Sequence, residues 1–318
     1  MIIEGIGATT HEDRHNCRLT KEALENFASQ INNGKYVPSV GIEHDSTLMP
    51  IGKTINAKIV ELDDGEFAVM VQQETFEKFE RLSISQLGNV YITSSEYDNR
   101  PFADTEPFEY EKNRIELDPV NFEYKDFKDV CTELEQKKDV ECKVMMRKSL
   151  IPDPEIVLNL VAGSFLVLCG KKTLEKTAER LSDNISEDIS NTYNKIKELL
   201  VLASSRIIPK NRPITYILKE NRGYILELII RTNDTNILFH ALSTEVISSV
   251  DENIDQFKSI FDEPTYKIQF IFNEEISKWE FNYLSTSKGK VIGSEKCYKK
   301  TIELSKHYLE KMRKNSQE

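Results

Sequence analysis

The chain has 318 residues, of which 39% are hydrophobic and 30% are charged, which suffices for about two domains with apolar cores. It is too apolar for a disordered chain, because 15 Phe and 12 Tyr supply large side chains for packing. The 42 basic and 53 acidic residues give a net charge of −11, which repels nucleic-acid phosphates and anionic membrane surfaces. We therefore expect a soluble globular protein that binds no nucleic acid.

The cysteines and the first residues bear on the compartment. The five cysteines are widely spaced and form no C-x-x-C pair, so the sequence indicates neither a disulfide framework nor a zinc site. No phosphate-binding glycine loop occurs. The first residues soon become acidic, unlike those of a secretion signal. These features predict a cytoplasmic protein with no metal and no cofactor.

The first half of the chain, residues 1–150, is expected to be β-rich with one early helix. Apolar periodicity predicts that helix at 19–31, with Thr20 as its N-cap and with an apolar face made of Leu19, Ala23, Phe27 and Ile31. Strands are expected at 39–43, 52–62, 66–72, 89–94 and 114–117, and a helix is suggested at 76–80. Asp63-Asp64-Gly65 predicts a hairpin turn between two of the strands.

The prolines at 149–154 predict a boundary, after which a helical connector is expected over residues 151–212. Its most apolar stretch, 156–169, is shorter than the roughly 20 residues that cross a bilayer. A buried helix is expected there, and membrane association is the minor alternative. A further helix is predicted from an apolar stripe made of Ile185, Ile189, Tyr193, Ile196 and Leu200.

Residues 213–318 are expected to form a second α+β domain, which makes the whole chain α+β. Strands are predicted at 214–219, 224–231, 236–241, 267–272 and 278–284, and helices at 243–261 and 295–314. Alternation places Trp279, Phe281 and Tyr283 on one face of a strand. These aromatic side chains are expected to pack in a core, and a recognition surface is the alternative.

Four short motifs precede residue 54, in the order Gly5-Ile6-Gly7-Ala8, Asp13-Arg14-His15, Val37-Pro38-Ser39-Val40-Gly41-Ile42-Glu43-His44-Asp45 and Pro50-Ile51-Gly52-Lys53. The order of a small-residue strand, an acidic segment, a helix, an apolar strand ending in His and a Pro-Ile-Gly strand resembles the tailed-phage prohead (capsid-maturation) serine protease family. The resemblance covers residues 5–122. It implies a protease fold for the first domain, 1–150.

The resemblance implies that His44 is the general base, because the family's base is the histidine that ends the apolar strand. The chemistry of the side chain agrees with this role. A general base needs rigid support and a pKa near neutrality, which histidine has without a large perturbation. We therefore expect His44 to lie beside a nucleophilic hydroxyl.

The family's nucleophilic serine lies in a later strand after a glycine, and residues 88–97 and 81–85 both compete for this role. Alternation along the first of these segments puts Ser94 on the apolar face of its strand. Ser94 is therefore the expected nucleophile, with Ser95 and Ser83 as alternates. Neither segment has the glycine that the family usually shows after Ser-Ile, which favours an inactive site.

The family also has an acidic residue near the end of the domain that can orient the histidine ring. The nearest match in this chain is Ile115-Glu116-Leu117-Asp118-Pro119-Val120-Asn121-Phe122. The resemblance therefore implies Glu116 as the third catalytic residue, with Asp118 as the alternate. Such a carboxylate would hold the ring in the tautomer that accepts a proton.

Two functional hypotheses follow. The first is a serine endopeptidase that cleaves a protein partner and is regulated by the domain at 213–318, in a setting such as conflict between phage and host. The second is a catalytically inactive protease fold that acts by binding or assembly, since a fold does not fix a function. Both imply a protein substrate or partner subunit, and a homo-oligomer is a further expectation.

Overall fold

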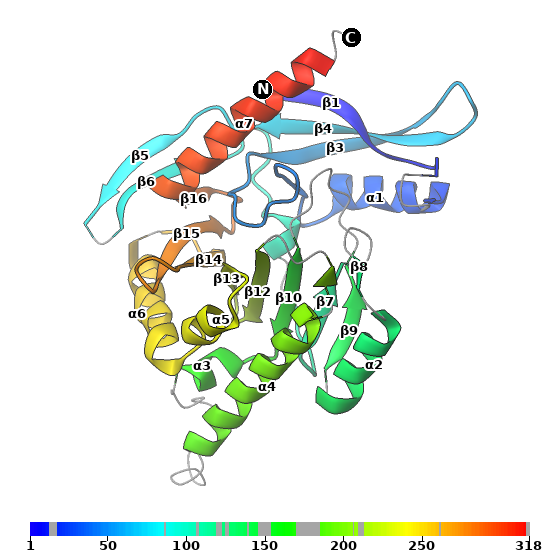
Figure 1. The fold of residues 1–318 in the computed structure, drawn as a ribbon. Coiled ribbons are helices and arrows are strands. Elements are labelled where there is room, and N and C mark those ends of the chain that lie inside the picture. Colours follow the sequence, from blue (N-terminus) through cyan, green and yellow to red (C-terminus); the bar gives the residue numbers. More distant parts are fainter. Residues whose placement is uncertain are drawn as a thin grey trace. The chain divides into compact units, whose positions relative to one another are not determined.

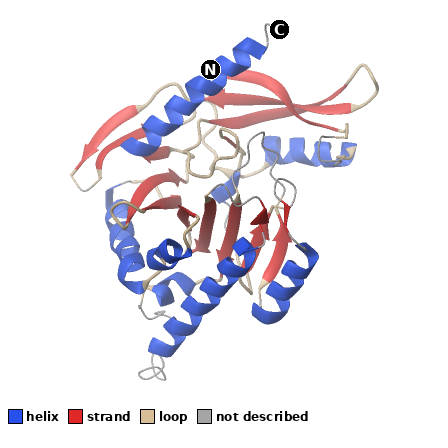
Figure 2. Ribbon diagram, viewed as in Figure 1, coloured by secondary structure: helices blue, strands red, loops and turns tan. Residues whose placement is uncertain are grey.

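The computed structural model of the chain describes residues 1–12, 18–85, 87–105, 108–118, 123–124, 127–138, 140–145, 154–169, 185–205, 207–208, 213–260 and 262–315. The chain divides into two compact units. The first consists of Met1–Glu106 and Asn282–Glu318, and the second consists of Pro107–Phe281. Helices and sheets occur in both units (Figure 2), so the expected α+β class is confirmed.

The elements follow one another as labelled in Figure 1. The first unit contains β1 (Ile2–Thr9), α1 (Lys21–Asn33), β2 (Ser39–Val40), β3 (Gly52–Glu61), β4 (Phe67–Thr75), β5 (Glu80–Ile84), β6 (Gly88–Thr93), a 3₁₀ turn (Ala103–Thr105), β16 (Val291–Ser294) and α7 (Glu295–Asn315). The second unit contains β7 (Arg114–Leu117), β8 (Glu123–Tyr124), α2 (Phe127–Lys138), β9 (Glu141–Val144), β10 (Glu155–Leu160), α3 (Ser164–Leu168), α4 (Ile185–Ser205), β11 (Ile207–Ile208), β12 (Ile214–Asn221), β13 (Ile225–Thr232), α5 (Thr235–Ala241), α6 (Thr244–Ile260) and β14 (Thr265–Asn273). The chain returns from the second unit to the first within β15 (Lys278–Thr286).

The two units do not follow the expected division at 150 and 212. The chain leaves the first unit near residue 106 and comes back to it at residue 282. The return is fixed by β16, which pairs antiparallel with β6 although about two hundred residues separate the two strands. A local sequence pattern carries no information on such a pairing. Of the proline-containing boundary predicted at 149–154, only Pro154 lies within the described residues.

The first unit contains an antiparallel sheet of order β1-β4-β3-β2, with α1 packed on one face. The tight turn between β3 and β4 confirms the predicted hairpin. Gly65 lies at a φ of 81° and donates its N–H to the carbonyl oxygen of Leu62 at 2.9 Å. Glycine reaches this positive φ without the steric cost that a side chain would add.

The helix α1 confirms the predicted helix and its N-cap, since the Thr20 hydroxyl accepts the Ala23 N–H at 3.2 Å. The face of this helix that was predicted to be buried was only partly right. Leu19 and Phe27 are exposed. Ile31 is buried as predicted, and it packs on the sheet together with Leu24 and Ala28. These three side chains meet Ala57, Val69 and Val71. The apolar face of the sheet selects the stripe of the helix that is buried.

The strands β5, β6, β16 and β15 form neighbouring strands in that order, and α7 packs along β6 and β16. The ring of Tyr298 on α7 stacks on Tyr91 of β6, with ring centres 3.8 Å apart. The helix that was suggested at 76–80, just before Ser83, is not formed. Ser83 lies in β5, which pairs antiparallel with β6. The pairing partner, rather than the local sequence, decides the conformation here.

The second unit has a mixed sheet of order β14-β13-β12-β10-β7-β9. The parallel pairs are β7 with β9, β10 with β12, and β13 with β14. Each parallel pair is connected through helices, as a parallel connection requires: α2 for the first, α3 and α4 for the second, and α5 and α6 for the third. Figure 1 shows α2, α4 and α5 over the same face of this sheet. A short pair, β8 with β11, lies outside it.

The apolar stretch at 156–169 is not the buried helix that was expected. It forms the strand β10, a turn and the short helix α3. β10 lies between its parallel neighbour β12 and its antiparallel neighbour β7, and every one of its residues is buried. Burial on both faces explains the unbroken apolar run. Among the described residues, no helix combines the length and the apolar character that a membrane span needs.

The segment 236–241 is also corrected, from a strand to the helix α5. The Asp234 carboxylate caps α5 by accepting the Asn236 N–H at 2.8 Å. The aromatic strand β15 is confirmed, and its side chains pack as expected. Trp279 and Tyr283 are buried, and the Trp279 indole N–H donates to the Ala241 carbonyl at 3.1 Å.

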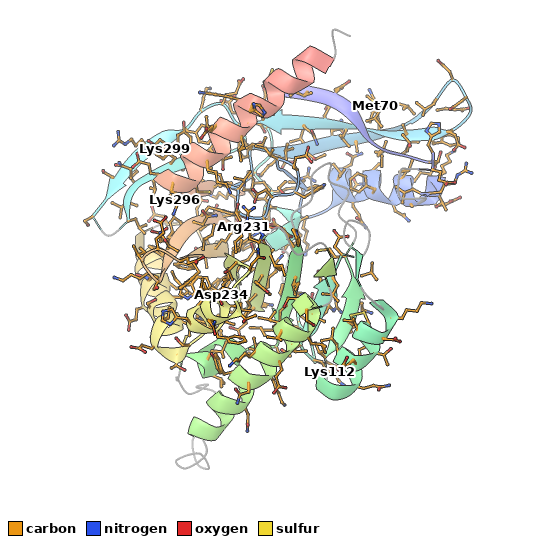
Figure 3. The ribbon with its side chains drawn as sticks, viewed as in Figure 1. Met70, Lys112, Arg231, Asp234, Lys296 and Lys299 are labelled. Atoms are coloured by element: carbon orange, nitrogen blue, oxygen red, sulfur yellow. A yellow bond between two sulfur atoms is a disulfide. The ribbon has the colours of Figure 1, made fainter. Side chains whose placement is uncertain are left out.

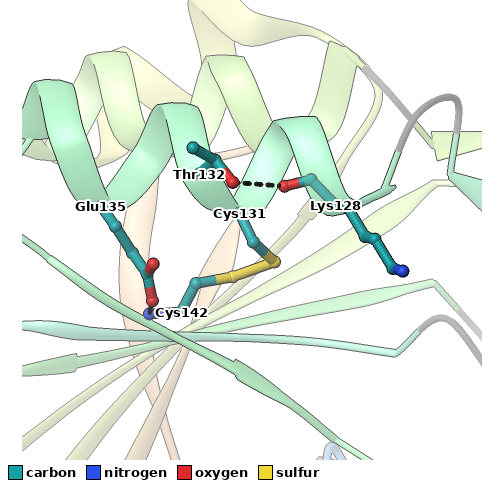
Figure 4. Close-up of a disulfide and its surroundings, with 5 residues drawn as sticks. All are labelled: Lys128, Cys131, Thr132, Glu135 and Cys142. Carbon is teal, nitrogen blue, oxygen red and sulfur yellow. Dashed lines mark hydrogen bonds between the residues drawn. A yellow bond between two sulfur atoms is a disulfide. The ribbon is translucent and has the colours of Figure 1, made fainter.

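The second unit contains a disulfide that the spacing of the cysteines did not indicate. Cys131 on α2 and Cys142 on β9 are joined (Figure 4), with their Cα atoms 5.5 Å apart. The Glu135 carboxylate on the same helix accepts the Cys142 N–H at 3.2 Å. The disulfide therefore ties α2 to the strand at the edge of the sheet. Cys169 and Cys297 are not part of this disulfide, and both are buried.

Candidate active site

We expected His44 at the end of a strand, but it lies in a turn after β2. The strand ends at Val40, and the His44 side chain is exposed. Glu43 and His44 have φ angles of 49° and 58°, which places both in the left-handed region. Each such residue costs about 1 kcal/mol or more relative to ordinary backbone. This conformation persists only where the surroundings hold it.

The next residues of the turn supply that support. The Asp45 carboxylate accepts the Thr47 N–H at 2.8 Å and the Thr47 hydroxyl at 2.5 Å. The Lys300 amine on α7 donates to the Thr47 hydroxyl at 2.6 Å and lies 3.4 Å from the Asp45 carboxylate. The Asn282 amide on β15 donates to the Thr47 carbonyl at 2.9 Å. These contacts fix the turn that carries His44.

Ser94 follows the last residue of β6 and is exposed. Within the part of the chain that the structure describes, its hydroxyl makes no hydrogen bond, so it is not paired with His44. The two residues lie in the same unit. In ligand-free sites a nucleophile and its base are often farther apart than in the working complex, so the predicted pairing stays a prediction.

The two alternate serines have other partners. The Ser95 hydroxyl bonds to the Glu74 carboxylate and accepts the Asp98 N–H at 2.7 Å. The Ser83 hydroxyl donates to the Asn89 side-chain oxygen at 2.8 Å. Both hydroxyls therefore have structural roles at the ends of strands.

The predicted acidic residues lie in the second unit, whereas His44 and Ser94 lie in the first. Glu116 is on β7, and its carboxylate accepts the Asn159 amide of β10 at 2.9 Å. Asp118 follows β7 and is buried. The hydrogen bond between Glu116 and Asn159 ties β7 to its neighbour β10.

A buried charged network beside the serines was missed by the sequence reasoning. Lys53 on β3 donates its amine to the carbonyl oxygens of Asp98, at 2.8 Å, and of Arg100. Burial lowers the pKa of Lys53 to about 8, although Asp98 and Glu74 favour its charged form. Glu74 on β4 is also buried and accepts the Glu96 N–H at 2.7 Å. The sequence signal that could have revealed this network is Lys53, because it interrupts the apolar face of its strand.

A second buried charged cluster lies on neighbouring strands of the second unit. Glu227 on β13 is 3.1 Å from the Lys219 amine and 3.3 Å from the Lys267 amine, and it accepts the Gln269 amide at 2.5 Å. Burial alone would raise the pKa of Glu227, but Lys267, Lys219 and Gln269 outweigh it and lower the pKa to about 2. This carboxylate is therefore ionised at neutral pH.

Among the described residues, no group of three His, Cys, Asp or Glu side chains is placed to hold a metal ion. Comparison of the chain with protein-family models, with curated proteins and with solved structures found no match in any of the three.

Proposed function

We propose that the protein is a serine endopeptidase of the prohead-protease type, with His44 as the general base and Ser94 as the nucleophile. The observation that carries the proposal is the turn at 43–47. It presents an exposed histidine on left-handed backbone that Asp45 and Thr47 hold in place. Ser94 is exposed in the same unit. A rigid base and an accessible hydroxyl are what this chemistry requires.

In the proposed reaction the Ser94 oxygen attacks a peptide carbonyl carbon while the His44 ring takes the hydroxyl proton. The ring then gives that proton to the leaving amine. An acyl-enzyme forms on Ser94, and water hydrolyses it with His44 again as the base.

The second candidate is a protease fold that binds or assembles without cleaving. It is favoured by the hydrogen bonds of the serines. The Ser95 and Ser83 hydroxyls are committed to Glu74 and Asn89, and the Ser94 hydroxyl has no partner among the described residues. In this reading the surface around His44 would be a contact for another protein.

The partner in both cases is a protein, as substrate or as subunit, and a homo-oligomer is part of the proposal. The C-terminal residues 282–315 support a controlling role, because they contact the His44 turn through Asn282 and Lys300. A cytoplasmic location and a role in conflict between phage and host complete the proposal. They rest on the composition and on the resemblance to prohead proteases.

Labelling with a fluorophosphonate probe tests the peptidase, because such probes react with a serine that a base has activated. The full chain is incubated with the probe, and the modified residue is identified by peptide mass analysis. Label on Ser94 that is lost in His44→Ala and retained in His11→Ala supports the proposal. His11 is the matched control, since it is an exposed histidine of the same unit that bonds to Asp64 at 2.7 Å.

The serine variants separate the alternatives. Ser94→Ala should abolish the label, and Ser95→Ala and Ser83→Ala should keep it. Absence of label on all three serines, in a protein that is folded by circular dichroism, would rule out the peptidase and leave the binding function.

A further inference from the structure

The turn that carries His44 is connected to a part of the chain more than two hundred residues away. The Lys300 amine donates to the Thr47 hydroxyl at 2.6 Å, and the Asn282 amide donates to the Thr47 carbonyl at 2.9 Å. All three residues lie in the first unit, so the contacts are internal to one compact body. Thr47 and Asn282 are buried, which shields the second hydrogen bond from water.

The turn is closed locally by the Asp45 N–H, which donates to the Ile42 carbonyl at 2.9 Å across Glu43 and His44. Glu43 and His44 are both left-handed, which is unfavourable for residues with a side chain. The Asp45 carboxylate bonds to Thr47 and so closes the turn locally. The same carboxylate and hydroxyl face Lys300, whose positive charge compensates Asp45. The C-terminal segment therefore adds contacts to the side of the turn that follows His44.

We propose that Lys300 and Asn282 are positioning residues that hold the His44 turn in its left-handed conformation. This deepens the proposed peptidase, on which its catalytic consequence rests. Neither residue touches a substrate in this scheme. Both act through Thr47, and Lys300 acts through Asp45 as well. The C-terminal segment thereby determines whether the histidine is held where a nucleophile can use it.

The helix α7 offers a matched control for Lys300. Lys299, labelled in Figure 3, is the preceding residue, and its amine bonds to Glu295 one turn earlier at 2.7 Å. Its side chain is two-thirds exposed. Lys300→Met and Lys299→Met remove the same charge from the same helix. Only the first removes a donor from the His44 turn.

Amide hydrogen exchange of the full chain is the first measurement. The Thr47 N–H is the reporter, because its acceptor is the Asp45 carboxylate that Lys300 faces. Lys300→Met should speed the exchange of this amide about tenfold, as expected for the loss of a charged hydrogen bond. Lys299→Met should leave it unchanged, and Lys300→Arg should restore most of the protection. Equal exchange in Lys300→Met and Lys299→Met would overturn the proposal.

The imidazole of His44 is the second measurement, since a merely structural change elsewhere would not move it. In Lys300→Met and Asn282→Ala the ring resonances of His44 should shift and broaden, while those of His11 stay in place. Unchanged His44 resonances in both variants would overturn the proposal. If Asn282→Ala fails to fold, Lys300→Met decides alone, because its side chain is partly exposed.

Cleavage or probe labelling separates this inference from the proposed function. In an active peptidase, Lys300→Met should lower kcat and leave KM nearly unchanged, because the substrate does not meet Lys300. If the turn loosens in Lys300→Met while the wild type neither cleaves nor takes the probe, the peptidase fails and the positioning role stands. If the wild type is active and Lys300→Met keeps full kcat with a protected turn, the positioning role fails alone.

Discussion

Lys53 on β3 and Glu74 on β4 occupy opposite positions of the hairpin, and both side chains are buried. The Lys53 amine donates to the Asp98 carbonyl at 2.8 Å, and the Glu74 carboxylate accepts the Ser95 hydroxyl. The two charges therefore bind the segment after β6 to the hairpin. This segment also carries the proposed nucleophile, so the hairpin supports the candidate site.

Lys53→Met should lower the free energy of unfolding by about 3 kcal/mol, because it leaves the Glu74 carboxylate buried without its opposite charge. It also removes the donor to two backbone carbonyls. Urea denaturation followed by circular dichroism measures the effect. Lys58→Met is the control, since Lys58 lies on the same strand with its side chain 61% exposed. If both variants lose the same free energy of unfolding, the buried Lys53 and Glu74 contribute no more to stability than an exposed lysine does.

The hairpin shows what the sequence could predict and where it stopped. The turn at Asp63-Asp64-Gly65 fixes the pairing of Ala57 with Val71. Continued without interruption, this register would place Thr75 opposite Lys53. A bulge between Thr54 and Asn56 shifts the register by one residue and brings Glu74 there instead. Turn chemistry therefore predicted the hairpin, but not the pairing of Lys53 with Glu74, which depends on the bulge.

The candidate site shows the same limit. The resemblance singled out His44 from its local motif, and the structure places this residue in an exposed turn. The contacts that fix the turn come from Asn282 and Lys300, which local patterns assigned to another domain. The error at β10 has a related cause, because a strand buried on both faces has the same apolar run as a buried helix. Long-range partners decided each of these cases.

Gly289→Ala should be far more destabilising than Gly65→Ala, although both glycines have positive φ angles of 64° and 81°. A Cβ at Gly289 would lie 2.1 Å from the Lys53 amine and 2.4 Å from the Arg100 carbonyl oxygen. A Cβ at Gly65 would meet nothing within 4 Å. We expect losses of about 1 kcal/mol at Gly65 from backbone strain alone and about 3 kcal/mol at Gly289. Chemical denaturation of both variants at the same pH measures the difference, and losses of the same size would contradict the predicted clash.

Glu220 should make the protein less stable as the pH rises from about 4.5 to 7. Burial raises the pKa of this carboxyl to about 7, against the Phe165 N–H and Arg222, which favour ionisation. Between these pH values the folded state holds a proton that the unfolded state has lost, so stability falls across this interval and levels off above it. Glu220→Gln should remove this part of the pH dependence and unfold at a higher urea concentration than the wild type at pH 8. A parallel decline in both proteins would mean that another group is responsible.

Glu227 should act in the opposite sense at acid pH. Its pKa of about 2 lies below the ordinary value of 4.5, so the unfolded state takes up a proton first as the pH falls. The stabilisation is present above pH 4.5 and is lost between pH 4.5 and 2, and it amounts to about 3 kcal/mol. Glu227→Gln should flatten this acid limb of the denaturation midpoint. It should also lower stability at pH 7, where the buried Lys267 and the partly buried Lys219 lose their shared carboxylate. An acid limb as steep as that of the wild type would contradict the assignment.

Reduction of the disulfide between Cys131 and Cys142 should loosen the second unit without unfolding the first. The bond closes a loop with a sequence separation of 11 residues, and opening it should lower the free energy of unfolding by about 3 kcal/mol. Both cysteines are only partly buried, so a dithiol reductant can reach them. The single tryptophan, Trp279, lies in the second unit and reports its unfolding by fluorescence. The double variant Cys131→Ser with Cys142→Ser should match the reduced wild type and should not respond to dithiothreitol. If the denaturation midpoint of the wild type is the same with and without reductant, the disulfide does not stabilise the fold. In a reducing cytoplasm the reduced form would then be the working state.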